Sequence, residues 1–209
     1  IGPNGAGNTT VFNLLTKVYQ PTHGTILLNG KDIHDLNTAQ VNRAGIARTF
    51  QNIRLFGELS VEENVTVAMD TQMHYTMPEG IFRLPRFWKE ERIVHERAME
   101  LLSIFHMEDL AKAKASSLPY GAQRRLEILR ALATNPSLLL LDEPAAGMNP
   151  SETAALMENI RSIRDTFKIA VLLIEHDMNL VMNICEGIAV LNFGHVIAKG
   201  TPEDIQNNP

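Results

Sequence analysis

The residues of this chain that could do chemistry begin at its first ten positions, Ile1 to Thr10. These follow the phosphate-loop pattern G-x-x-x-x-G-K-[ST], with Gly2, Gly7 and Thr9 in place and Asn8 where the pattern has lysine. A loop of this kind turns tightly at glycine, so that successive backbone N–H groups point at a phosphate. It leads into a helix whose N-terminus attracts the same anion, and the Thr9 hydroxyl is then a predicted ligand of Mg²⁺.

Two other interpretations of this loop stay open at this point. A dinucleotide loop has the pattern G-x-G-x-x-G, and Gly5-Ala6-Gly7 supplies its first half, but Thr10 stands at its third glycine. A glycine turn without any ligand also fits, because the lysine is missing. The rest of the chain has to decide among the three.

Two adjacent carboxylates follow a continuous apolar run. Ser137 to Leu141 reads as a central parallel strand, and Asp142 and Glu143 stand at its carboxyl end, where open α/β sheets bind ligands. Asp142 is placed to hold Mg²⁺ through water, and Glu143 to orient or deprotonate an attacking water. The alternative is a pair of solvated acids at a strand end.

Three further features have both a functional and a plain interpretation. His176 stands at the end of a second predicted buried strand, Ile169 to Glu175, as Asp142 stands at the end of the first, although a lone histidine is usually structural. Gln51 is either a loop amide or a ligand of Mg²⁺ that senses the γ-phosphate. The turn from Leu118 to Ala122 is either the start of a helix or a second anion site at that helix N-terminus.

Composition narrows the function classes. The chain has 209 residues, 44% of them hydrophobic, and a net charge of −5, which argues against a nucleic-acid partner. Its one cysteine, Cys185, excludes an intramolecular disulfide framework, and no apolar run reaches the length of a membrane span. Because the chain starts inside the loop motif, we expect it to be an N-terminally truncated fragment.

The remaining patterns predict an α/β core with a helical insertion. A short strand at 25–28 closes at Asn29-Gly30, and a hairpin is expected at 188–198 through Phe193-Gly194. Between them, Ser60 opens a capping box and an apolar stripe from Val94 to Phe105 predicts an amphipathic helix. Residues 71–92 show no clear periodicity, and their aromatic and basic side chains suggest either a solvated insertion or a docking surface. We therefore expect 1–50 and 131–209 to form the core and 51–130 the helical subdomain.

The order of these features resembles the ATP-binding subunit of ABC transporters along the whole chain. The features of the family follow one another here in the family's order, from the phosphate loop, the glutamine loop and the helical insertion to the signature turn, the D-E-P strand and the switch histidine. Finer motifs are most similar to those of branched-chain amino acid importers, namely Gly45 to Phe56, Tyr120 to Ile128, Asp142 to Pro150 and Ile174 to Met178. The resemblance implies a P-loop NTPase (RecA-like) core with an inserted ABC-type α-helical subdomain.

The resemblance also implies a role for each matching residue, with ATP and Mg²⁺ as cofactors. The catalytic residues would be Glu143 as base, His176 at the γ-phosphate and Gln51. Mg²⁺ would be served by Thr9, Gln51 and Asp142. Nucleotide-binding residues would be Gly2, Pro3, Asn4, Gly5, Ala6, Gly7, Asn8, Thr9 and Thr10, with the signature Leu118, Pro119, Tyr120, Gly121 and Ala122, and Asn149 between the sites.

The implied partners are a second ATP-binding subunit in a head-to-tail dimer, transmembrane permease subunits and, indirectly, an extracytoplasmic solute-binding protein. The implied place is the cytoplasmic face of the plasma membrane. The chain departs from the family at Asn8, which removes a positive charge, at Pro119, which lacks an N–H, and at Ala122, which lacks a polar side chain. The sequence thus predicts an ATP-hydrolysing importer subunit. The alternatives are a subunit that binds nucleotide without hydrolysing it and a non-transport ABC ATPase.

Overall fold

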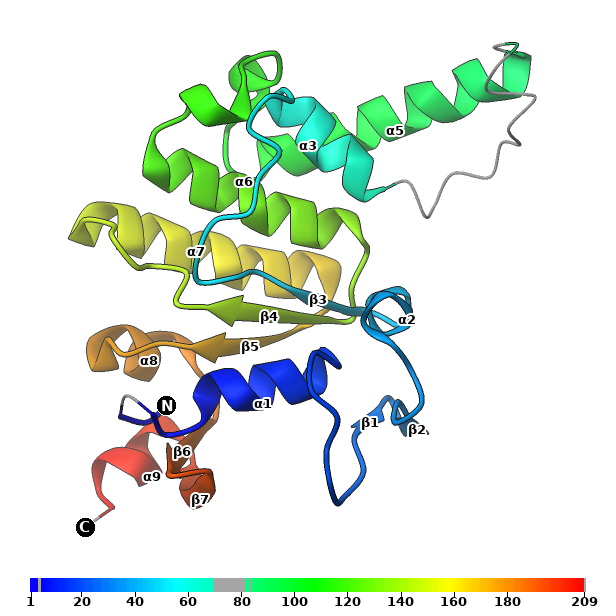
Figure 1. The fold of residues 1–209 in the computed structure, drawn as a ribbon. Coiled ribbons are helices and arrows are strands. Elements are labelled where there is room, and N and C mark those ends of the chain that lie inside the picture. Colours follow the sequence, from blue (N-terminus) through cyan, green and yellow to red (C-terminus); the bar gives the residue numbers. More distant parts are fainter. Residues whose placement is uncertain (4, 70–81, 83, 209) are drawn as a thin grey trace. The chain divides into compact units, whose positions relative to one another are not determined.

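The computed structural model describes residues 1–3, 5–69, 82 and 84–208, which form two compact units (Figure 1). One unit comprises Ile1–Gln51 and Ser137–Pro209, and the other comprises Asn52–Pro136. The expected assignment of a nucleotide-binding core and a subdomain that carries a signature remains a prediction. Within the described part of the chain, no helix is both long and apolar enough to cross a membrane.

A three-stranded parallel sheet forms the centre of the first unit. Its strands are β3 (Ile46–Arg48), β4 (Leu138–Asp142) and β5 (Ala170–Ile174), in the order β3-β4-β5. Leu139, Leu140 and Leu141 of β4 are almost fully buried, which is typical of a central parallel strand covered on both faces. The predicted parallel strand is confirmed, and the chain leaves all three strands at the same edge of the sheet.

Five helices of the described residues belong to this unit. They are α1 (Asn8–Leu15), α2 (Thr38–Arg43), α7 (Pro150–Phe167), α8 (Met178–Ile184) and α9 (Pro202–Gln206). Phe12 of α1 and Val41 of α2 pack with Leu140 and Ile174 in one apolar cluster. Burial of a side chain such as Phe12 stabilises the fold by about 1.5–3 kcal/mol. The loop before α1 is therefore anchored directly on the sheet.

Two antiparallel hairpins complete the unit. Strands β1 (Leu27–Leu28) and β2 (Lys31–Asp32) are joined by Asn29 and Gly30, and β6 (Ile188–Asn192) and β7 (His195–Gly200) by Phe193 and Gly194. All four turn residues have positive φ, as a two-residue hairpin turn of type I′ requires. Both hairpins were predicted from these dipeptides.

The second unit is helical. It contains α3 (Val61–Ala68), α5 (Pro85–Ser103), α6 (Tyr120–Ala133) and the short 3₁₀ helices η2 (Glu108–Leu110) and η3 (Ala115–Ser117). The capping box predicted at Ser60 is present, because its hydroxyl accepts from Glu63 N while the Glu63 carboxylate accepts from Ser60 N. Buried Asn64 bonds both the N–H and the carbonyl of Phe56, which ties the entering segment to α3.

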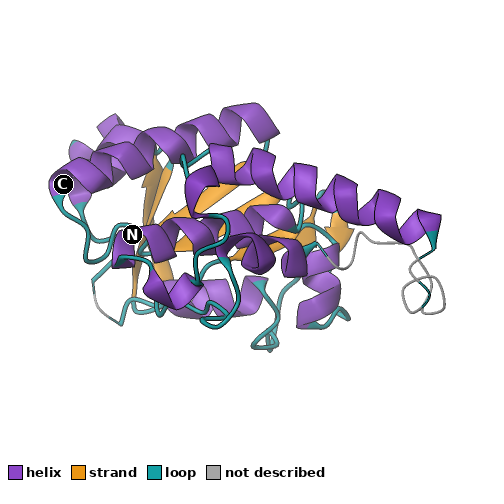
Figure 2. Cartoon of the chain, turned by 90° about the horizontal axis from the view of Figure 1, so that it is seen from above, coloured by secondary structure: helices purple, strands orange, loops and turns teal. Residues whose placement is uncertain are grey.

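Residues 71–92 show no clear hydrophobic periodicity in the sequence, but the end of this stretch is helical in the structure. Helix α5 begins at Pro85 and runs unbroken to Ser103 (Figure 2), whereas 70–81 and 83 lie outside the described residues. The first turns bury few apolar side chains and so lack the stripe that reveals a helix. Pro85 at the first helical position and the i,i+4 pairs Arg86–Glu90 and Arg92–Glu96 favour the helix there instead.

Gly45 enables the tight connection into β3, and its replacement tests that packing. Its φ is +111°, and a Cβ on it would lie 2.7 Å from Ser137 Oγ. We expect Gly45→Ala to lower the free energy of unfolding by about 1–3 kcal/mol, because positive φ and crowding add. Gly24→Ala is the matched control, since Gly24 has φ +89° but open space around it. Equal losses in urea unfolding of the two variants would contradict the crowding.

Candidate functional site

The N-terminal loop has the backbone of an anion-binding site. Gly5 and Gly7 have φ of +81° and +104°, and Ala6 N donates to Pro3 O at 2.9 Å, so the loop folds back before α1. Gly7 is the N-cap of α1, and because glycine has no side chain it supplies no oxygen to the first-turn N–H groups. Asn8, Thr9 and Thr10 follow as the first turn, and Asn4 lies outside the described residues.

Strand β6 and the turn after it hold this loop in place. Ile1 N donates to Ala189 O at 2.8 Å, Leu191 N to Ile1 O at 2.7 Å, and Gly194 N to Ala6 O at 2.8 Å. A Cβ on Gly2 would overlap the Leu191 carbonyl oxygen and the Ala6 side chain. Gly2 is therefore required by close packing against β6, a reason that its spacing in the sequence motif does not reveal.

The structure brings together the three residues predicted to be catalytic. Glu143, directly after β4, lies between Gln51 and His176, which follow β3 and β5. The Gln51 amide donates from Nε2 to one Glu143 carboxylate oxygen at 3.3 Å, and His176 Nε2 lies 3.0 Å from the other. Both oxygens of Glu143 thus have a polar neighbour that fixes the plane of the carboxylate.

This arrangement suits general-base chemistry on a water. The Glu143 side chain is 23% exposed and that of His176 is 43% exposed, so solvent or a ligand reaches both. Glu143 has φ +46°, an unusual backbone conformation for a residue with a long side chain, and such strain clusters at functional sites. A carboxylate held at both oxygens keeps its orientation while it accepts a proton.

Asp142 lies in a different environment from its neighbour. Its side chain is 5% exposed, and Oδ2 accepts from Arg48 Nη2 at 2.8 Å. Its backbone N–H donates to Thr49 Oγ1 at 3.3 Å. Sequence reasoning missed Arg48, although one signal was present, namely a basic residue at the end of a strand that pairs with the strand carrying Asp142.

The three residues predicted to bind Mg²⁺ have side-chain oxygens that suit this ion. They are the Thr9 hydroxyl, which is exposed on α1, the Gln51 amide oxygen and the Asp142 carboxylate. In the described part of the chain no three His, Cys, Asp or Glu side chains gather as a metal cluster. One carboxylate, one amide and one hydroxyl suit an ion that keeps several waters and takes its other ligands from phosphates. The metal assignment of these three residues stays a prediction.

Asn149 caps a helix, as its sequence context predicted. Its side-chain oxygen accepts from Glu152 N at 3.0 Å and from Ser151 Oγ at 2.7 Å, at the start of α7. In turn, the Asn149 N–H donates to the Glu152 carboxylate at 3.0 Å, which completes a capping box. The expected place of Asn149 near a nucleotide between two subunits remains a prediction.

The predicted signature forms the N-terminus of α6 in the helical unit. Pro119 is the N-cap, Tyr120 is 48% exposed, and Leu118 and Ala122 are buried. Leu118 O accepts from Gln123 Nε2 at 2.8 Å, which secures the turn, and Gly121 completes it within the first helical turn. The turn therefore presents a helix N-terminus, and its role as an ATP contact remains a prediction.

A second buried carboxylate, Glu175, was also missed by the sequence. Glu175 accepts from Ala145 N at 3.0 Å through one oxygen and from His176 N at 3.3 Å through the other. It thereby ties the segment after β4 to the segment after β5. Burial raises the pKa of Glu175 above 4.5, and the two backbone N–H groups oppose that rise.

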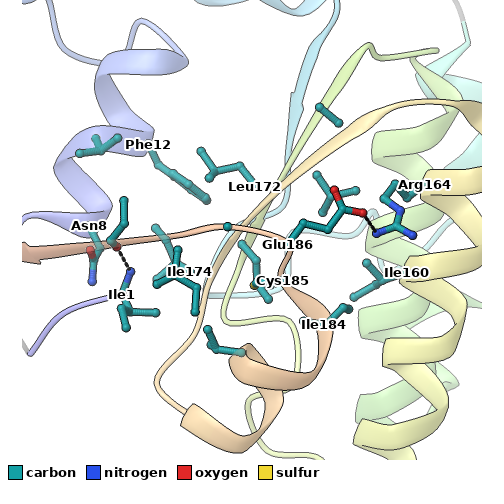
Figure 3. A pocket seen from close by; sticks show the side chains of 18 of the residues that line it. Ile1, Asn8, Phe12, Ile160, Arg164, Leu172, Ile174, Ile184, Cys185 and Glu186 are labelled. Carbon is teal, nitrogen blue, oxygen red and sulfur yellow. Dashed lines mark hydrogen bonds and ion pairs between the residues drawn. The ribbon is translucent and has the colours of Figure 1, made fainter. Parts of the chain in front are cut away.

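An apolar cavity of about 470 Å³ lies beside β5 (Figure 3). Its lining includes Ile1, Phe12, Leu172, Ile174, Ile184 and Cys185. The Arg164–Glu186 ion pair, 2.7 Å between Nη1 and Oε1, also borders it, as does Asn8. Neither Glu143 nor its neighbours Gln51 and His176 line this cavity, and its apolar wall does not suit a phosphate.

A glycine loop that is hydrogen-bonded to β6 and leads into α1, beside a parallel sheet with acidic residues at the strand ends, is typical of a P-loop NTPase. Residues 1–146 match the family described as ABC transporter. The branched-chain amino acid transport ATP-binding proteins BraF of Pseudomonas aeruginosa and LivG of Escherichia coli K12 are each 48% identical over 209 residues, covering all of this chain and 82% of theirs. The chain belongs to the ABC transporter family.

Solved structures support the same fold. The ATP-binding cassette MJ1267 in its ADP conformation is 30% identical and superimposes with a TM-score of 0.83 over all of this chain and 83% of that one. The cassette MJ0796 in a dimeric, post-hydrolysis state with ADP and Pi is 25% identical, with a TM-score of 0.79 over 96% of this chain and 83% of that one. The predicted fold class is thus confirmed.

Glu175 predicts how stability changes with pH. Because its pKa is raised in the folded state, the folded protein binds more protons than the unfolded one above pH 4.5, and stability falls as pH rises. We expect the free energy of unfolding of the parent chain to fall relative to that of Glu175→Gln between about pH 5 and about pH 8 in urea titrations.

Asp204→Asn is the control for this pH effect. Backbone and side-chain hydrogen bonds from Thr201 lower the pKa of Asp204 below 3.8, so its contribution is lost only in more acidic solution. Its stability difference from the parent should stay level over the same range. A difference for Glu175→Gln that is also level, or that rises with pH, would show that burial does not govern this carboxyl.

Proposed function

We propose that this chain binds and hydrolyses ATP as a subunit of an ABC importer for branched-chain amino acids. The names of its 48% identical relatives support both the nucleotide and the solute class. The observation that carries hydrolysis is the Glu143 carboxylate held between Gln51 and His176. As part of a transporter, the chain would bind peripherally at the cytoplasmic face of the plasma membrane.

Each group of the site has a defined role in this reaction, and Gln51 has two. The N–H groups of Gly5 to Thr10 bind the ATP phosphates, as the turned loop and the helix N-terminus favour. Glu143 orients the attacking water and accepts its proton, while Gln51 and His176 fix the carboxylate and reach the γ-phosphate side. A Mg²⁺ bound by Thr9, Gln51 and Asp142 would supply charge neutralisation of the phosphates.

The partners follow from the same proposal. A second copy or a related subunit would face this one head to tail, so that the signature at 118–122 of one subunit covers the ATP held by the other. A dimeric cassette with ADP and Pi among the similar structures supports this. Permease subunits would span the membrane, and a solute-binding protein outside would deliver the amino acid.

Asn8 favours a second candidate, a subunit that binds nucleotide and partners without hydrolysing ATP. Residues 1–10 contain no lysine or arginine, so the loop brings no charged side chain to the phosphates. An amide donates hydrogen bonds but does not neutralise charge, and asparagine is shorter than lysine. Glu143, Gln51 and His176 are nevertheless all present and in contact. The two candidate functions differ only in whether the bound ATP is hydrolysed.

Restoring the lysine tests this difference. We expect Asn8→Lys to raise the ATPase rate at least about tenfold, roughly 1.4 kcal/mol, because the ammonium stabilises charge in the transition state. Asn8→Gln is the control, since it adds length but no charge. Equal steady-state rates in all three proteins would contradict the argument from charge.

Replacing the base separates ATP binding from turnover. In the Asn8→Lys protein, we expect Glu143→Gln to abolish phosphate release while ATP still binds, so that an ATP-bound dimer accumulates. Gel filtration with and without Mg-ATP measures the dimer, and Glu186→Gln, on a side chain that is 82% exposed, is the control. Full phosphate release by Glu143→Gln, or a monomer under both conditions, would overturn the assigned role or the head-to-tail closure.

A further inference from the structure

Arg48, the last residue of β3, makes an unusual set of contacts for a charged residue. Its side chain is only 7% exposed. Nη1 donates to Asn13 Oδ1 on α1 at 2.7 Å, and Nη2 donates to Asp142 Oδ2 at the end of β4 at 2.8 Å. One guanidinium therefore links three separate elements of the parallel-sheet unit.

Two aromatic rings accompany this guanidinium. The Arg48 Cζ lies 5.3 Å from the ring centroid of Phe12 and 5.3 Å from that of Phe50. A planar, weakly hydrated guanidinium tolerates such contacts, whereas a compact ammonium requires more water. The rings restrict the positions that the Arg48 side chain can adopt, so its two hydrogen bonds are held in fixed directions.

Each of the three linked elements carries a residue of the predicted Mg²⁺ site or leads directly into one. Asn13 lies four positions after Thr9 on the same face of α1, and Gln51 comes three positions after Arg48. Asp142 is itself the third predicted ligand. We propose that Arg48 is a positioning residue, which fixes Thr9, Gln51 and Asp142 relative to one another so that they receive a nucleotide-bound divalent cation together.

The guanidinium acts through geometry and through charge. Its two terminal nitrogens donate to Asn13 and Asp142 at the same time. The single ammonium of lysine cannot donate in the same two fixed directions. It also compensates the buried Asp142 carboxylate before any cation arrives, so the carboxylate keeps its orientation in the free protein. The role rests on the proposed function, because it requires that a metal–nucleotide complex binds here.

The first test needs no ligand. Amide hydrogen exchange of the free chain is measured for peptides that cover Asn8–Leu15, Arg48–Gln51 and Leu138–Glu143, in the parent, Arg48→Lys and Asn13→Ala. We expect Arg48→Lys to speed exchange at least about threefold in all three peptides. Asn13→Ala, which removes one of the two tethers, should affect mainly Asn8–Leu15.

The chain offers a matched control in its helical unit. Arg124 is fully buried and pairs with Glu127 through Nη1 and Oε2 at 2.7 Å, so Arg124→Lys perturbs a similar buried pair elsewhere. Arg124→Lys should leave the three peptides unchanged. A similar general increase of exchange for Arg48→Lys and Arg124→Lys would show that Arg48 has only a structural role, which overturns the proposal.

The second test measures the cation. Affinity for a fluorescent ATP analogue is determined with Mn²⁺ and with EDTA. We expect Arg48→Lys to reduce the gain in affinity produced by Mn²⁺ at least about tenfold and to change the affinity in EDTA less than about twofold. An equal loss with Mn²⁺ and with EDTA, or no loss at all, overturns the positioning role. If the parent chain gains nothing from Mn²⁺, the proposed metal–nucleotide site itself fails, and the role of Arg48 fails with it.

Discussion

The parallel backbone hydrogen bonds among β3, β4 and β5 determine where the polar side chains at the ends of these strands lie. Their register places Arg48 opposite Leu140, and Asp142 opposite Ile174. Gln51, Glu143 and His176 then follow the three strand ends at one edge of the sheet. A shift of β4 by one residue would exchange the environments of Asp142 and Glu143, because neighbouring side chains of a strand point to opposite faces. The register of the strands thus buries Asp142 beside Arg48 and leaves Glu143 accessible to solvent.

Local signals in the sequence were sufficient where a short segment determines its own structure. Asn29-Gly30 and Phe193-Gly194 formed the expected hairpin turns, and Ser60 and Asn149 formed their capping boxes. The leucine run at 138–141 reads as a buried parallel strand because only a strand covered on both faces tolerates it. The contact of Glu143 with Gln51 and His176 was not itself predicted, but it agrees with the rule that the carboxyl ends of parallel strands meet at one edge of the sheet.

Long-range contacts explain what the sequence could not predict. Arg48 meets Asn13 and Asp142 across 35 and 94 positions, and no local pattern connects those residues. Glu175 bonds Ala145 across 30 positions in the same way. The start of α5 was missed for the opposite reason. Its first turns are stabilised by a proline and by exposed ion pairs, and hydrophobic periodicity does not detect these.

The main consequence of Asn8 is the loss of the positive charge that lysine would bring to the loop, and not the shorter side chain. A triphosphate has to be met by positive charge or by oriented N–H groups, and the first ten residues supply no cationic side chain. Arg48 is the buried cation at the strand ends, but its guanidinium is committed to Asp142 and Asn13. Glu143 and Glu175 add acidic groups at the same edge of the sheet. Under the proposed function, binding of phosphate would depend on the backbone of Gly5 to Thr10 and on a divalent cation. A cation bound with the nucleotide would then contribute more than in a loop that has its lysine, and the proposed orientation of its ligands by Arg48 would matter correspondingly more.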